Sequence, residues 1–103
     1  MSAGETAALA PEGAAARLEA ARGEIERIDR ALVGLMAERV RLAREVGAAK
    51  RVLGMPILDP AREAAVVRRA GALAREAGIP DEDVRYLFWH LIGLSRRAQM
   101  EEG

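Results

Sequence analysis

The sequence predicts an all-α protein with one long helix and two shorter helices in each chain. Apolar residues recur every three or four positions through most of the chain, which is the spacing of an amphipathic helix. No segment alternates polar and apolar residues over a useful length, so no strand is expected. Only three aromatic residues are present, Tyr86, Phe88 and Trp89, so the core must be aliphatic, as packed helices allow.

Composition limits the possible functions. The 103 residues are enough for one domain, and 50% hydrophobic with 31% charged residues is typical of a folded, soluble protein. Sixteen basic residues are balanced by sixteen acidic ones, which argues against a general nucleic-acid binder. The absence of cysteine excludes disulfides and thiolate chemistry, and a single histidine, His90, argues against a transition-metal site.

Residues 1–15 are rich in Ala, Gly, Ser and Pro, and we expect them to form a flexible leader before a helical domain over 16–103. No basic segment precedes their alanines, so they do not resemble a signal peptide. No apolar run reaches the roughly 20 residues of a membrane span. We therefore expect a cytoplasmic protein without a membrane partner.

The long helix is expected to run from about Pro11 or Ala15 to Val52, with Gly54 and Pro56 as its stop signal. About 35 residues at ~1.5 Å each span ~52 Å, which exceeds the ~33 Å diameter of a compact 100-residue domain. Because one chain cannot cover an apolar face of that length, we expect a two-fold homodimer in which the long helices pack antiparallel or cross. A plain coiled-coil zipper is the alternative, and the two shorter helices argue against it. The apolar stripe consists of Leu18, Ala21, Ile25, Ile28, Leu32, Leu35, Leu42, Val46 and Ala49.

Each shorter helix has a recognisable start. Asp59 is an N-cap and Pro60 occupies the first helical position of the second helix, which should end at Gly78. Pro80 and Asp81 begin the third helix, whose apolar residues are again three or four apart.

Arg39 stands where the stripe of the long helix requires an apolar residue. A cation on a buried stripe is costly unless an anion meets it. Two explanations stay open at this point. Arg39 forms an ion pair within the protein, for example with Glu38 or Glu45 of a neighbour, or it binds an anionic ligand.

Helix geometry groups the other cations of the long helix. Lys50 follows Arg39 by eleven residues, which places the two within ~20° of one face and ~16 Å apart, so both can reach one small anion. Arg22 precedes Arg39 by seventeen residues, ~25 Å, and cannot reach that anion in its own chain. In the expected dimer, Arg22 of one chain can lie beside Arg39 and Lys50 of the other, which makes the site shared.

The shorter helices supply further candidates. Arg62 and Glu63 lie in the first turn after Asp59, where free backbone N–H groups favour oxygen ligands. Ser95 and Gln99 form the polar end of one line on the third helix. Each has an ordinary structural explanation, since Asp59 alone is a cap and the other two alone are helix-end residues. Taken together with the cations, they describe a pocket for a small dianion that carries a hydroxyl group.

These residues resemble the AroQ class of chorismate mutases, which are small all-helical intertwined dimers. The resemblance covers about residues 16–100, and its motifs are weak singly but strong as an ordered set. The motifs are Arg22-x-x-Ile25-x-x-x-Asp29, Leu35-Met36-Ala37-Glu38-Arg39, Val46-Gly47-Ala48-Ala49-Lys50, Asp59-x-x-Arg62-Glu63 and Ser95-x-x-x-Gln99.

The resemblance implies the rearrangement of chorismate to prephenate, a step in phenylalanine and tyrosine biosynthesis that needs no cofactor. Arg22 would bind one substrate carboxylate in the partner's site, and Arg39 would bind the other in its own subunit. Lys50 and Gln99 would donate to the ether oxygen, which makes them, with Arg39, the implied catalytic residues.

The remaining roles follow from the same resemblance. Glu63, with the backbone near Asp59, would receive the ring hydroxyl, and Arg62 and Ser95 would help to hold a carboxylate. Arg96 departs from the family, which has a small aliphatic residue at that position. It bears on substrate choice if it faces the pocket and means little if it faces solvent.

Other functions stay open. A mutase for 4-amino-4-deoxychorismate would use the same pocket, with Glu63 receiving an amino group. An isochorismate-pyruvate lyase shares the fold and the cations, but it lacks the carboxylate at the position of Glu63. A non-catalytic helical dimer would not need the full set of polar residues. The sequence is also compatible with association with another enzyme of the aromatic pathway.

Overall fold

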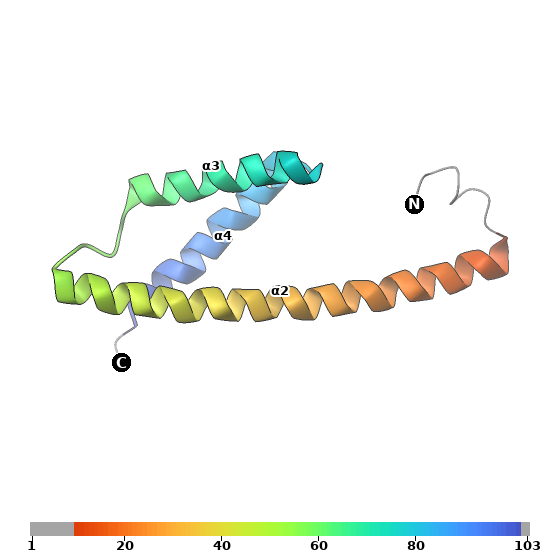
Figure 1. The fold of residues 1–103 in the computed structure, drawn as a ribbon, viewed down its shortest axis with the longest axis horizontal. Coiled ribbons are helices and arrows are strands. Elements are labelled where there is room, and N and C mark those ends of the chain that lie inside the picture. The colour runs from red at the N-terminus through yellow and green to blue at the C-terminus, as the bar shows by residue number, and fades with distance from the viewer. Residues whose placement is uncertain (1–9, 102–103) are drawn as a thin grey trace. The chain divides into compact units, whose positions relative to one another are not determined.

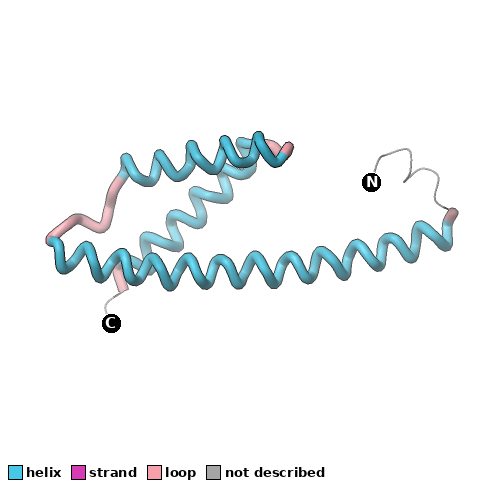
Figure 2. Tube along the Cα trace, viewed as in Figure 1, coloured by secondary structure: helices cyan, strands magenta, loops and turns pink. Residues whose placement is uncertain are grey.

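The computed structural model describes residues 10–101, which form three α-helices and no strand (Figures 1 and 2). The helices are α2 (Pro11–Leu53), α3 (Pro60–Ala77) and α4 (Asp81–Gln99). The predicted all-α class, with one long and two shorter helices, is confirmed. Over the described range, no helix combines the length and the apolar character needed to cross a bilayer.

The chain divides into two compact units, and the boundary lies between Leu35 and Met36, inside α2. In the first unit, the described part is the N-terminal portion of α2. That helix begins at Pro11, within the segment 1–15 expected as a leader, while residues 1–9 lie outside the described residues. In both units the large apolar residues of the predicted stripe are 44–61% exposed in the single chain: Leu18, Ile25, Ile28, Leu32, Leu35, Leu42 and Val46.

The helix ends follow the chemistry of their sequence. Gly54 and Gly78 have φ of 69° and 74°, a left-handed conformation that glycine adopts without steric cost and that ends α2 and α3. The Asp59 carboxylate accepts a hydrogen bond from the backbone N–H of Arg62 at 3.1 Å, and Pro60 begins α3. The N-cap and the stop at Gly78 predicted for this helix are therefore confirmed.

Helices α3 and α4 pack against each other as a hairpin (Figure 1). Val66, Val67 and Ile92 are buried between them, with Phe88 packed against this cluster. Ala70 and Ala74 of α3 are almost fully buried, so small side chains allow the two helices to approach closely. This hairpin forms two walls of the pocket described below.

The C-terminal part of α2 closely approaches the end of α4. Ala43 and Gly47, one turn apart, are the buried residues of α2. A Cβ atom built on Gly47 would lie 2.7 Å from the Cα atom and 2.8 Å from the carbonyl carbon of Gln99. Only glycine therefore permits this approach between the two backbones.

We expect Gly47→Ala to destabilise the protein, although the same change in an open helix stabilises it. The methyl group overlaps backbone that cannot rotate away, which typically costs about 1–3 kcal/mol, so a net loss of up to about 2 kcal/mol remains after the ~1 kcal/mol gain in helix propensity. Urea unfolding followed by circular dichroism measures this difference.

Gly23→Ala is the matched control for this change. Gly23 lies in the same helix, and a Cβ there has no neighbour within 4 Å. This variant should be neutral or more stable than the parent. Equal effects of the two substitutions would show that α2 does not approach α4 at Gly47.

Candidate functional site

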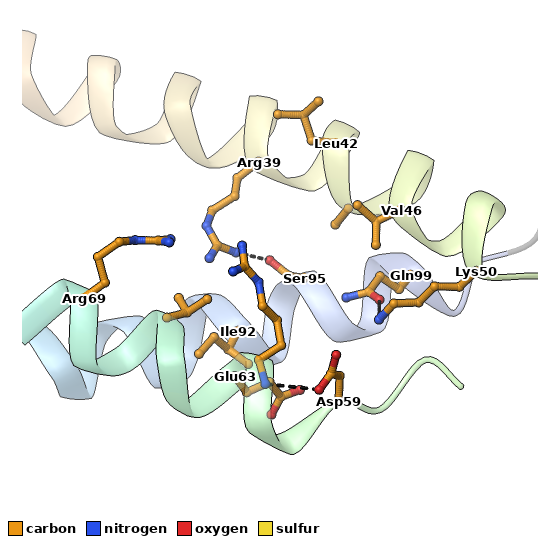
Figure 3. Close-up of a pocket in the computed structure, with 13 residues that line it drawn as sticks. Arg39, Leu42, Val46, Lys50, Asp59, Glu63, Arg69, Ile92, Ser95 and Gln99 are labelled. Atoms are coloured by element: carbon orange, nitrogen blue, oxygen red, sulfur yellow. Dashed lines mark hydrogen bonds between the residues drawn. The ribbon is translucent and has the colours of Figure 1, made fainter. Parts of the chain in front are cut away.

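A pocket lies within the second unit, between the C-terminal part of α2 and the hairpin of α3 and α4 (Figure 3). Four cations, two carboxylates, a hydroxyl and an amide surround it, together with an aliphatic wall. The structure thus brings together seven of the eight predicted site residues, all except Arg22. The lining residues are Arg39, Leu42, Ala43, Val46, Lys50, Asp59, Arg62, Glu63, Val66, Arg69, Ile92, Ser95 and Gln99.

Arg39 points from α2 into this pocket and donates a hydrogen bond from Nη1 to Ser95 Oγ (Figure 3). Partial burial lowers the pKa of Arg39, and the nearby charges of Arg69 and Arg62 lower it further. Within the described part of one chain Arg39 forms no ion pair, and Glu45 pairs with Arg41 at 3.3 Å instead. The guanidinium is thus a partly desolvated cation whose charge no carboxylate of residues 10–101 balances.

Lys50 and Gln99 form a direct pair at the other end of the pocket (Figure 3). Lys50 Nζ donates to Gln99 Oε1 at 2.8 Å and to the carbonyl oxygen of Ile57 at 2.9 Å. Because Gln99 accepts through its oxygen, its amide nitrogen is kept as a second donor beside the ammonium group.

Asp59 and Arg62 are placed by the start of α3. The Asp59 side chain is engaged in the cap, so its carboxylate is fixed to the backbone of the first turn. That turn brings the Arg62 side chain to the pocket, and Arg62 forms no ion pair with any described residue.

Glu63 is held by two hydrogen bonds from Arg96 of α4. The sequence alone did not show whether the Arg96 side chain faces the pocket or solvent. Arg96 Nη2 donates to Glu63 Oε1 at 2.5 Å, and Arg96 Nε donates to Glu63 Oε2 at 3.1 Å. The pair is bidentate, the strongest geometry between a guanidinium and a carboxylate. Glu63 raises the pKa of Arg96 through this hydrogen bonding and its charge. Arg96 thus faces a pocket residue and not solvent alone.

Sequence analysis missed one pocket cation, Arg69. It follows Arg62 by seven residues, which is two helical turns, so the spacing already placed both on one face of α3. Arg22 is not among the lining residues. It is exposed in the first unit, with its Nη1 atom 3.8 Å from Glu19 Oε1.

These side chains are of the kinds that can bind an anion and stabilise negative charge that develops during a reaction. It offers at least five groups able to donate to an anion: three guanidinium groups, an ammonium group and an amide. Across residues 10–101, no three His, Asp or Glu side chains are grouped so that they could share a metal ion.

The fold and the pocket define an all-α protein with a cation-rich pocket between three helices. Residues 21–100 match the family model described as chorismate mutase type II. The chain therefore belongs to this family, and the family predicted from its motifs is confirmed.

Known proteins similar to this chain include two relatives and one solved structure. The chorismate mutase of Methanocaldococcus jannaschii is 38% identical over 85 residues, which cover 82% of this chain and 86% of that protein. The T-protein of Enterobacter agglomerans is 32% identical over 88 residues, 85% of this chain and 24% of that protein. A conserved hypothetical protein from Pyrococcus furiosus has a TM-score of 0.67 and 31% identity, covering 81% of this chain and 95% of that one.

The chain thus spans about a quarter of the T-protein and most of the archaeal enzyme. The family and the relative named chorismate mutase support the isomerase activity predicted from the sequence.

We expect Arg39→Met to stabilise the ligand-free protein. A pKa lowered by folding means that the folded state disfavours the charged form, so removing the charge should raise Tm. Thermal unfolding followed by circular dichroism measures this. Arg41→Met, which removes an exposed cation paired with Glu45, is the control and should change Tm little. A lower Tm for Arg39→Met would instead make Arg39 a stabilising structural residue.

Proposed function

We propose that this chain catalyses the rearrangement of chorismate to prephenate in the cytoplasm, within phenylalanine and tyrosine biosynthesis. The observation that carries the proposal is the pocket itself, where the Lys50 and Gln99 pair shares one space with Arg39 and Arg62. Membership of the chorismate mutase type II family supports the same reaction.

The pocket groups match the chemistry of this substrate. Chorismate carries two carboxylates, a ring hydroxyl and an ether oxygen that joins the enolpyruvyl group to the ring. We assign one carboxylate to Arg39, with help from Ser95, which it already contacts. Lys50 and Gln99 are assigned to the ether oxygen, since both present donors at one end of the pocket.

The remaining assignments concern α3. Glu63 accepts a hydrogen bond from the ring hydroxyl, because the bidentate contact with Arg96 fixes the position of its carboxylate. Arg62 assists in holding a carboxylate, and Asp59 contributes by capping the turn that positions Arg62 and Glu63.

The reaction needs no nucleophile and no general base. One C–O bond breaks while one C–C bond forms, so the barrier falls when the flexible substrate is held with its reacting carbons in contact. Negative charge grows on the ether oxygen as the C–O bond breaks. The ammonium of Lys50 is already fixed by two hydrogen bonds, so it can meet that charge with little reorganisation.

The working unit in this proposal is an intertwined homodimer. The exposed apolar stripe of α2 is the surface that a second copy would cover. Fully burying an exposed side chain of this size is worth roughly 1.5–3 kcal/mol, and these half-exposed side chains would gain about half of that each. Arg22 of the partner would then bind the second carboxylate. This assignment gives Arg22 a role in substrate binding, although Arg22 does not line the pocket of its own chain.

One assay tests the reaction. The protein is incubated separately with chorismate, isochorismate and 4-amino-4-deoxychorismate, and the products are identified. We expect prephenate from chorismate. Salicylate and pyruvate from isochorismate would indicate a lyase, and no conversion of any of the three would contradict an enzymatic function.

Lys50→Ala tests the mechanism in the same assay. Loss of a donor to a developing oxyanion lowers the rate by about 10²–10³. We expect at least this loss in kcat, with an unchanged circular dichroism spectrum and oligomeric state. Turnover close to that of the parent in the folded variant would exclude Lys50 from the mechanism.

Complementation tests the shared site. Arg22→Ala and Lys50→Ala chains should each be inactive alone, whereas a mixed dimer contains one site with both residues intact. Random pairing gives mixed dimers in half the population, so co-expression should restore about a quarter of the parental activity. Absence of any recovery, with mixed dimers demonstrated by two affinity tags, would place Arg22 outside the partner's site.

A further inference from the structure

The Glu63 and Arg96 pair joins the first turn of α3 to the last turns of α4. Glu63 lines the pocket, whereas Arg96 does not. The Glu63 side chain is 16% exposed and that of Arg96 is 38% exposed, so the carboxylate is the better shielded partner. Arg96 thus holds Glu63 from outside the pocket.

The bidentate contact fixes what Glu63 can offer a ligand. Each carboxylate oxygen has two lone-pair sites and gives one to Arg96, so each keeps one acceptor site. The guanidinium also compensates the negative charge, so the pair as a whole is neutral. A hydroxyl needs only an acceptor, whereas an ammonium group also needs uncompensated negative charge.

The rest of the pocket carries an excess of positive charge, because its one other carboxylate is outnumbered by four cations. The other lining carboxylate, Asp59, is engaged in capping α3. Arg39, Lys50, Arg62 and Arg69 are all cations. An ammonium beside Glu63 would therefore meet a neutral pair in a positively charged surrounding.

We propose that Arg96 determines substrate specificity, by holding Glu63 in a neutral ion pair that accepts a ring hydroxyl and discriminates against a ring ammonium. This inference rests on the proposed function and separates chorismate from 4-amino-4-deoxychorismate, whose amino group is a cation at neutral pH. Arg96 acts through Glu63 and is a positioning residue, not a catalytic one.

The experiment compares kcat/KM for these two substrates in four proteins. The parent should prefer chorismate. Arg96→Met keeps the length of the side chain and removes its charge, so the ratio of kcat/KM for the amino substrate to that for chorismate should rise about tenfold or more. One charge at hydrogen-bonding distance commonly shifts such equilibria by this much. Arg96→Lys keeps the charge without the bidentate geometry and should give a smaller change.

Arg97→Met is the matched control. Arg97 is the next residue of α4, is exposed and forms no ion pair among residues 10–101, so its removal should leave the ratio unchanged. If Arg96→Met fails to fold, Arg96→Gln retains a hydrogen bond to Glu63 without charge and should shift the ratio in the same direction.

The outcomes separate this inference from the proposed function. A parent that prefers the amino substrate would overturn the inference, as would an Arg96→Met protein in which both activities fall and their ratio does not change. The second result would make Arg96 a structural tie between helices. Failure of the parent to convert chorismate would overturn the proposed function itself, whatever the ratio.

Discussion

The site depends on the close approach of α2 to the C-terminal end of α4 at Gly47. Lys50 lies three residues after Gly47 and reaches the side chain of Gln99, the residue whose backbone Gly47 meets. Arg39 lies two turns before Gly47 and contacts Ser95, one turn before Gln99. The contacts at both ends of the pocket therefore depend on the same alignment of α2 against α4. A side chain at position 47 would push α2 away from α4 and shift the contacts of Arg39 with Ser95 and of Lys50 with Gln99 together. Gly47 therefore controls the geometry of the pocket although it has no side chain to contribute.

The pocket is assembled at an electrostatic cost. Four cations face it, and its two carboxylates are engaged in a helix cap and an ion pair. The lowered pKa of Arg39 is the sign of this cost, because burial and the charges of Arg69 and Arg62 all oppose its ionisation. A dianion would relieve the repulsion when it binds, so part of the binding energy is already stored in the ligand-free arrangement. Interactions fixed before the substrate arrives need little reorganisation during the reaction.

The sequence predicts structure correctly where neighbouring residues alone determine it, as at the ends of a helix. Asp59, Pro60 and Gly78 set the ends of α3 through their own backbone and side-chain chemistry, and the structure has these ends where they were predicted. Sequence reasoning identified the pocket residues that belong to an ordered motif set. It did not identify Ala43 and Gly47 as the buried face of α2, because two small residues signal a close contact only when the opposing helix is known. Arg96 could not be oriented for the same reason, since its partner Glu63 lies 33 positions away on another helix.

The two carboxylates show how this pocket can be selective for anions and still recognise a hydroxyl. A carboxylate without a cationic partner would repel a dianionic substrate. A pocket without any carboxylate would lack a strong hydrogen-bond acceptor for the hydroxyl group. The Asp59 carboxylate accepts a hydrogen bond from the backbone N–H of Arg62 at the start of α3, where the helix dipole favours negative charge, and the Glu63 carboxylate pairs with Arg96. The acceptor atoms of Glu63 remain available while Arg96, which does not line the pocket, compensates the charge of that carboxylate. Recognition of the ring substituent and attraction of the carboxylates can therefore operate side by side in one small space.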